Sequence, residues 1–191
     1  MALLRLTAPA ADLLTVEDAK AQLRVEVDDE DALIGSYIKA ATARLDGPAG
    51  LLGRALVTQQ WRLTLPSFLP AIPLPLPPCQ LVETVTYEDA TRTIQTLDST
   101  TYRVDGAGGD DAAVLIPTDG TPWPAGSNVT VDFTAGYGDT AEDVPEGLRQ
   151  AVRLLVGHWH RGREAVVIGS IVNDLPFGFE DLIRDYRLWS F

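Results

Sequence analysis

Apolar residues at helical spacing open the chain. Thr15 and Asp18 form the Thr-x-x-acid pair that is typical of a helix start, and apolar residues follow at intervals of three and four. This pattern predicts a first helix over about 15–24.

A second apolar stripe begins at Leu33 and continues to the Gly47-Pro48 pair, which terminates helices. We predict a helix over about 28–46, with Asp28 as its N-cap.

The middle of the chain changes to the spacing of β-strands. In "LVTQQWRLTL", Val57, Trp61, Leu63 and Leu65 share one side, and "VTVDFTA" alternates in the same way. The intervening "LVETVTYEDATRTIQTL" indicates a hairpin that turns near Asp89.

Six prolines lie between residues 66 and 78. Such a run can bind an SH3-type partner as a polyproline helix. We favour an extended connection or an edge strand, because proline protects exposed sheet edges from aggregation.

Helical spacing returns near the end of the chain and predicts a helix over about 144–161. The preceding "FTAGYGDTAED" has two glycines but no lysine and is rich in acids, so it does not resemble a phosphate-binding loop. We interpret Asp143 as the helix N-cap, with Glu146 completing a capping box, and Gly162 as the C-terminal stop. A short helix is predicted over about 178–186.

These elements predict the α+β class, with three to four helices in a bundle and a mainly antiparallel β insertion. The 191 residues fit a single domain, with a helical part over 1–55, the insertion over 56–135, and helix and tail over 136–191. No apolar run is long enough to span a bilayer, and the N-terminus does not read as a signal peptide.

The net charge is −12, and the acids are unevenly distributed. From residue 145 onward six Arg balance six Asp and Glu, whereas the first 144 residues hold nine Lys and Arg against 21 acids. A nucleic-acid binder presents a basic face, so sequence-specific DNA binding is not expected.

No set of residues indicates catalysis, a cofactor or a metal. His158 and His160 point away from each other on a helix, and the chain has no third His. Cys79 is the single cysteine, lacks a nearby activating charge and cannot form an internal disulfide. The acids at 28–31 are contiguous, unlike the alternating ligands of a calcium loop, and they suit the positive end of a helix dipole.

Several strings together carry a family resemblance. "LTVEDAKAQLRVEVDDEDALIGSYIKAATARLD" is followed by "GRALVTQQWRLTL", "LVETVTYED" and "YRVD", and then by "FTAGYGDTAEDVPEGLRQAVRLLVGHWHRGRE". In these segments the chain resembles the head–tail connector, or adaptor, proteins of long-tailed phages, prophages and phage-like gene transfer agents. The resemblance departs at Gly47-Pro48-Ala49-Gly50, where relatives usually carry an aromatic helix end.

The resemblance implies a structural virion protein with no catalytic motif and no cofactor. It implies a homo-oligomeric ring, twelvefold in relatives, that lies beneath the portal protein and through which double-stranded DNA passes. A tail-side connector or stopper protein is the expected second partner, and no membrane is involved. The expected location is the head–tail junction of the particle, after assembly in the host cytoplasm.

Two surfaces are candidates for these roles. If the acidic residues face the channel, they prevent the wall from holding DNA; the candidates are Asp28, Asp29, Glu30 and Asp31. Aromatics and arginines at the C-terminus are residue types that anchor interfaces, so we expect this tail to dock on the portal or a neighbouring subunit; its candidates are Phe177, Phe179, Arg184, Tyr186, Arg187, Trp189 and Phe191. Chain ends can also fold back onto their own domain, and this possibility stays open.

Two other classes of function remain. A monomeric binding module for a glycan or peptide would need a concave aromatic patch, for which the candidates are Trp61, Tyr87, Tyr102 and Trp123. An enzyme would need a buried cluster of carboxylates with a metal ion.

Overall fold

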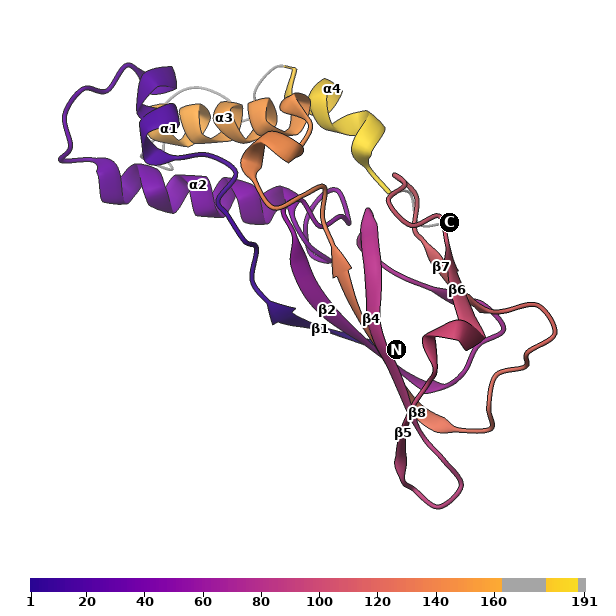
Figure 1. The fold of residues 1–191 in the computed structure, drawn as a ribbon. Helices are drawn as coiled ribbons and strands as arrows, with labels where there is room; N and C mark the ends of the chain where they lie inside the picture. Colours follow the sequence, from indigo (N-terminus) through magenta and orange to yellow (C-terminus); the bar gives the residue numbers. More distant parts are fainter. Residues whose placement is uncertain (163–177, 189–191) are drawn as a thin grey trace, which may run out of the picture.

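The computed structural model describes residues 1–162 and 178–188 and places helices and strands in two separate parts (Figure 1). The α+β class predicted from the sequence is confirmed. The helices are α1 (Val16–Leu23), α2 (Asp31–Leu45), α3 (Glu146–Arg161) and α4 (Phe179–Ile183), with 3-10 turns η1 (Ser99–Thr101), η2 (Ala141–Asp143) and η3 (Arg184–Tyr186). The strands are β1 (Ala2–Thr7), β2 (Gln59–Ser67), β3 (Ile72–Pro73), β4 (Cys79–Glu88), β5 (Ile94–Thr96), β6 (Tyr102–Asp105), β7 (Val114–Pro117) and β8 (Ser127–Ala135).

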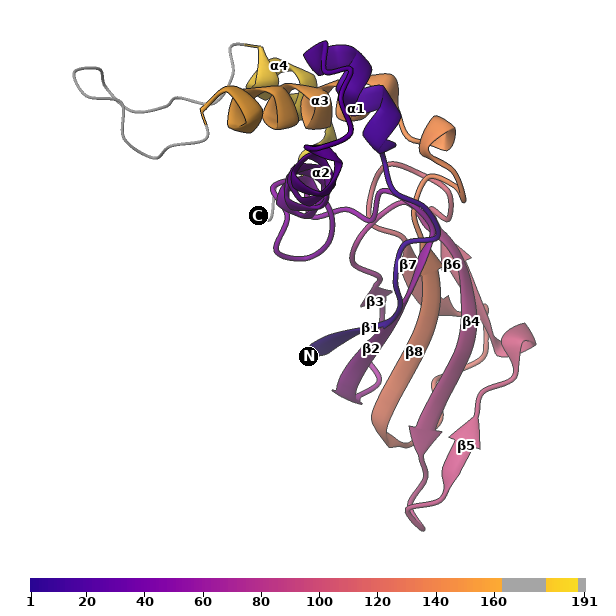
Figure 2. The ribbon, with the colours of Figure 1, turned by 90° about the vertical axis from the view of Figure 1, so that its left-hand side faces the viewer.

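The helices enclose one hydrophobic core. In Figure 2, α1, α2 and α3 lie together above the strands. The apolar stripe predicted on the last long helix is confirmed, because Leu148, Val152 and Leu155 of α3 are fully buried. The facing helix α2 contributes Ile34 and Leu45, which are also fully buried.

The strands form a second core between two antiparallel sheets. The larger sheet has the order β1-β2-β8-β4-β5, and the smaller one has the order β3-β7-β6. Inward residues of the larger sheet, such as Leu63, Val131 and Val85, are fully buried, while Arg62 and Asp132 pair on its outer face. The predicted alternation is therefore confirmed for β2 and β8, and Asp89 closes the β4–β5 hairpin as expected.

The N-terminal strand β1 was not predicted from the sequence. Ala2–Thr7 pairs antiparallel with β2, so the larger sheet combines the N-terminus with the predicted insertion. Val57 also differs from the prediction, since it precedes β2 and belongs to the helical core.

Two predicted helix caps were wrong. The N-cap of α2 is Glu30, and the Asp28 carboxylate instead accepts a hydrogen bond from Lys20. Asp143 instead belongs to η2, where its carboxylate accepts a hydrogen bond from the N–H of the N-cap residue Thr140. The N-cap of α3 is Pro145, which supplies no side-chain hydrogen bond.

Two other helix ends and the short helix near the C-terminus were predicted correctly. Thr15 and Asp18 form the predicted capping box, with the Asp18 N–H donating to Thr15 Oγ1 at 3.0 Å. Gly162 is the C-cap of α3, and the last described helix lies inside the predicted range of 178–186.

The proline-rich segment forms an edge strand, as we favoured. Ile72–Pro73 is the outer strand of the smaller sheet, and Leu74 and Leu76 continue its buried side into the β core.

No helix among residues 1–162 and 178–188 is long and apolar enough to cross a membrane.

Candidate partner-binding surfaces

The described part of the C-terminal tail packs on its own subunit. Phe179 and Ile183 of α4 are fully buried in the helical core, and Tyr186 packs against that core. Phe179 was expected on a partner-binding surface, and that placement was wrong. A short helix with two large apolar residues on one face gains more by covering its own core than by facing solvent.

Arg54 holds the end of this segment. Its side chain is only 3 % exposed, and its Nε–H donates to the backbone carbonyl of Tyr186. Next to it, the Leu188 N–H donates to the Leu52 carbonyl at 3.1 Å. Arg54 Nη1 also lies 3.5 Å from the Asp110 carboxylate, so one buried cation links the tail to the loop between β6 and β7. Local patterns gave no sign of this role, although Arg54 lies inside the string "GRALVTQQWRL" that supported the resemblance.

The remaining tail candidates differ in exposure. Arg184 is 67 % exposed and lies 3.6 Å from both Asp181 and Asp185. Arg187 is less exposed and pairs with Glu180 at 3.3 Å. Of the described candidates, Arg184 is therefore the one most open to a partner. Phe177, Trp189 and Phe191 lie outside the described residues.

The acidic candidates lie at the start of α2 and do not form one uniform patch. Lys20 Nζ contacts Asp28 at 2.5 Å and Asp31 at 2.8 Å, so it neutralises part of the segment. Glu30 lies 2.8 Å from His160 Nε2 of α3. Asp29 is exposed, which leaves it as the candidate best placed to act on a passing anion.

The pairing with Lys20 also changes the titration of these groups. Its hydrogen bond and its charge lower the pKa of Asp28, and the two carboxylates raise the pKa of Lys20. Because the folded pKa of Asp28 is depressed, the stabilising contribution of Asp28 exists above the unfolded pKa and is lost as the pH falls. Asp28 therefore stays ionised, and paired with Lys20, at neutral pH.

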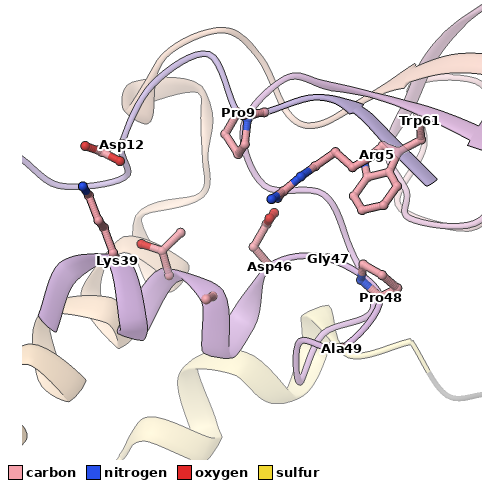
Figure 3. A pocket seen from close by; sticks show the side chains of 12 residues that line it. Arg5, Pro9, Asp12, Lys39, Asp46, Gly47, Pro48, Ala49 and Trp61 are labelled. Atoms are coloured by element: carbon pink, nitrogen blue, oxygen red, sulfur yellow. The ribbon is translucent and has the colours of Figure 1, made fainter. Parts of the chain in front are cut away.

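An open groove of about 700 Å³ lies between β1 and the end of α2 (Figure 3). Arg5 lies 5.9 Å from the ring of Trp61 and extends toward the Asp46 carboxylate. Asp46 accepts hydrogen bonds from the Leu56 N–H at 2.8 Å and from Gln59 at 3.0 Å. Its burial nevertheless raises its pKa. These contacts connect the helical part to the β part, so the groove lies beside a structural junction.

The proposed aromatic patch is not assembled. Trp61 is 4 % exposed and contacts Arg5, whereas Phe68 stacks on Trp123 at 4.9 Å and meets Tyr87 edge-on at 5.5 Å. These rings, like Tyr102, pack against the β core. Because Trp61 is buried, the four candidates do not form one open surface for a sugar ring.

The metal-binding and nucleophilic candidates can also be compared with the structure. The part of the chain that the structure describes holds no group of three or more His, Cys, Asp or Glu that could bind a metal ion. Cys79 is buried, and desolvation raises the pKa of its thiol to about 11, which disfavours the nucleophilic thiolate.

The family profile of the phage gp6-like head-tail connector proteins matches residues 14–106 and 125–187. The chain belongs to this family. The resemblance to head–tail connector proteins seen in the sequence is therefore confirmed. No match was found among the curated proteins compared.

Solved structures of gene transfer agent particles contain similar chains. A chain in the virion of a native particle has a TM-score of 0.78 and 27 % identity, and the match covers 100 % of this chain and 97 % of that one. A chain in the neck of an empty particle, computed with C6 symmetry, has a TM-score of 0.78 and 28 % identity over the same shares. A chain in the neck of a native particle, computed with C12 symmetry, has a TM-score of 0.70 and 25 % identity, again over the same shares.

Proposed function

We propose that this connector protein is a single-domain subunit of a ring at the neck of a phage or gene transfer agent particle. The observation that carries the proposal is the full-length similarity to chains in the necks of gene transfer agent particles, where the match leaves out almost nothing of either chain. Those necks were computed with C6 and C12 symmetry. A subunit that shares this fold from end to end is suited to the same kind of cyclic assembly.

The ring joins the portal protein on the head side to a tail-side connector or stopper protein. The C-terminal segment supplies the portal contact, through Arg184 and the tail residues beyond the described part. Its fixed attachment through Arg54 supports this proposal, because an interface element held in place loses less conformational entropy on binding.

Double-stranded DNA passes through the ring without sequence recognition. The acid excess in the first 144 residues supports this proposal, since a negative wall releases no counterions and does not retain the duplex. In this arrangement the start of α2, with Asp29 exposed, faces the channel.

Electron microscopy of the purified chain mixed with the portal of its own particle tests the ring. We expect one ring of connector subunits on each portal. In parallel, Arg184→Glu should melt like the parent yet co-sediment less with the portal, whereas Arg103→Glu, a matched change at a half-exposed arginine of β6, should bind normally. Absence of the chain from portal complexes contradicts the proposed function. Equal binding of both variants contradicts the role of Arg184.

A further inference from the structure

One edge of the larger sheet is open and apolar. β1 is its outermost strand and, among residues 1–162 and 178–188, pairs only with β2, so within this part of the chain its other side presents unpaired backbone groups. Two apolar residues of β1 and the residue before it are exposed: Leu4 is 61 % exposed, Leu6 42 % and Met1 80 %. Natural edge strands are usually short or protected by charged side chains or proline. β1 has six residues and one charged side chain, Arg5, which lies over the Trp61 ring and extends toward Asp46. Such an edge is a template for contact with another chain.

The opposite edge of the same sheet has a similar character. β5 is the last strand, and Ile94 at its start is 71 % exposed. Pairing across the sheet shows which face these side chains occupy. Leu4 is opposite Arg62, which pairs with Asp132 on the outer face. Ile94 is opposite Glu88, two residues from Thr86, whose hydroxyl meets Thr130 on that face. Leu4 and Ile94 therefore belong to the same face, at opposite edges.

A cyclic ring requires this kind of arrangement. Each subunit of a ring uses two different surfaces, one for the preceding copy and one for the following copy. We propose that the β1 edge of one subunit contacts the β5 edge of the next, so that Leu4 and Leu6 are covered on the neighbour's Ile94 side. This inference rests on the proposed ring and names the interface that closes it.

The width of the sheet sets the size of such a ring. Five strands spaced about 4.8 Å apart make a sheet about 24 Å wide. Twelve such sheets placed edge to edge give a circumference of about 290 Å and a radius of about 46 Å. The family profile begins at residue 14 and leaves β1 out, whereas the similarity to the neck chains covers the whole of this chain.

Covalent cross-linking of assembled rings tests the contact. Leu4→Cys and Ile94→Cys are combined in one chain, rings are formed on the portal, and a flexible bis-maleimide is added. Buried Cys79, with its raised thiol pKa, does not compete for the reagent. We expect a ladder of covalent multimers on a denaturing gel from the double variant and only monomers from either single variant.

The controls separate the possible failures. The pair Val27→Cys and Ile94→Cys keeps Ile94 and replaces Leu4 by another exposed apolar position, so it should give no ladder. Dimers from Leu4→Cys alone would show that two β1 edges meet, and the proposal would be wrong. Normal rings without a ladder from the double variant also contradict it, while the proposed function stands. If the parent forms no rings on the portal, both proposals fail.

A second measurement does not depend on the reagent. Leu4→Glu combined with Leu6→Glu changes exposed side chains, so the melting temperature should stay close to that of the parent. Ring formation on the portal should fall at least tenfold, because buried carboxylates would replace apolar contacts. Leu69→Glu changes a comparably exposed leucine away from both edges and should assemble normally. Equal assembly of the two variants contradicts the proposal.

Discussion

The buried guanidinium of Arg54 connects the C-terminal tail to the β part. Its Nε–H satisfies the Tyr186 carbonyl at the end of the tail, and its Nη1 is near Asp110 on the loop between β6 and β7. A charge in this position cannot be recognised from local sequence, because both partners are far away in the chain. The burial of Phe179 was hidden for a similar reason, since an aromatic near a terminus has the same local pattern in a core and in an interface.

Replacing Arg54 should release the tail. Arg54→Gln removes the charge and the Nε–H donor, and we expect a loss of about 1–3 kcal/mol in the free energy of unfolding. Amide exchange at residues 184–188 should become faster. Arg184→Gln, at an exposed arginine of the same segment, should change stability by less than about 0.5 kcal/mol. Unchanged exchange in Arg54→Gln would show that α4 alone holds the tail.

Asp46 should make stability depend on pH. Desolvation raises its folded pKa above the unfolded value, so its favourable contribution is complete below the unfolded pKa and is lost as the pH rises through the folded pKa. Asp46→Asn keeps an acceptor for the Leu56 N–H but does not ionise. The stability of Asp46→Asn relative to the parent should therefore increase between about pH 3 and pH 7. A constant difference in denaturant titrations across this range would contradict the effect of burial.

At the scale of elements, regular apolar spacing was the reliable signal. The stripe of α3 and the alternation of β2 and β8 were read correctly because each element buries one complete face. β1 was missed because "ALLRLT" buries only Leu3 partly and leaves Leu4 and Leu6 exposed. Its formation depends on pairing with β2, a long-range contact that spacing within the segment does not encode.

The stripe of α3 should carry much of the stability of the helical part. Leu155 is fully buried, so Leu155→Ala should cost about 2–5 kcal/mol through lost burial and the resulting cavity. Ile94→Ala removes a side chain that is 71 % exposed and should cost less than about 0.5 kcal/mol. Urea unfolding of both variants compares them. Equal midpoints would mean that the core has collapsed around the deletion or that α3 is not central to it.

At the scale of the whole molecule, composition and resemblance predicted the class of protein but not its surfaces. The fold class and the family were recognisable from strings spread along the chain. The candidate surfaces were not, because exposure depends on which residues the tertiary fold brings together. Asp28 and Asp31 looked equivalent to Asp29 in sequence, yet both of them share the positive charge of Lys20.

This distinction leads to a test of the proposed channel. Asp29→Lys changes an exposed acid without removing a partner of Lys20, so the fold should be unaffected. If the start of α2 faces the channel, particles with this variant should deliver DNA more slowly at low salt. The defect should shrink toward 1 M salt, where the Debye length falls to about 3 Å. Asp111→Lys makes the same change on the loop between β6 and β7, and equal delivery by both variants would remove Asp29 from the channel wall.

The two ends of the β part lie next to each other. The backbone N–H of Thr58 donates to the Gly138 carbonyl at 2.8 Å, and the backbone N–H of Tyr137 donates to the Leu56 carbonyl at 2.9 Å. The chain therefore leaves the helices and returns to them at one point. The match to the family profile has a gap inside the β part, between residues 106 and 125. A change in length within residues 107–124 should therefore leave the packing of the helices unaltered, because both connections to the helices lie outside that stretch.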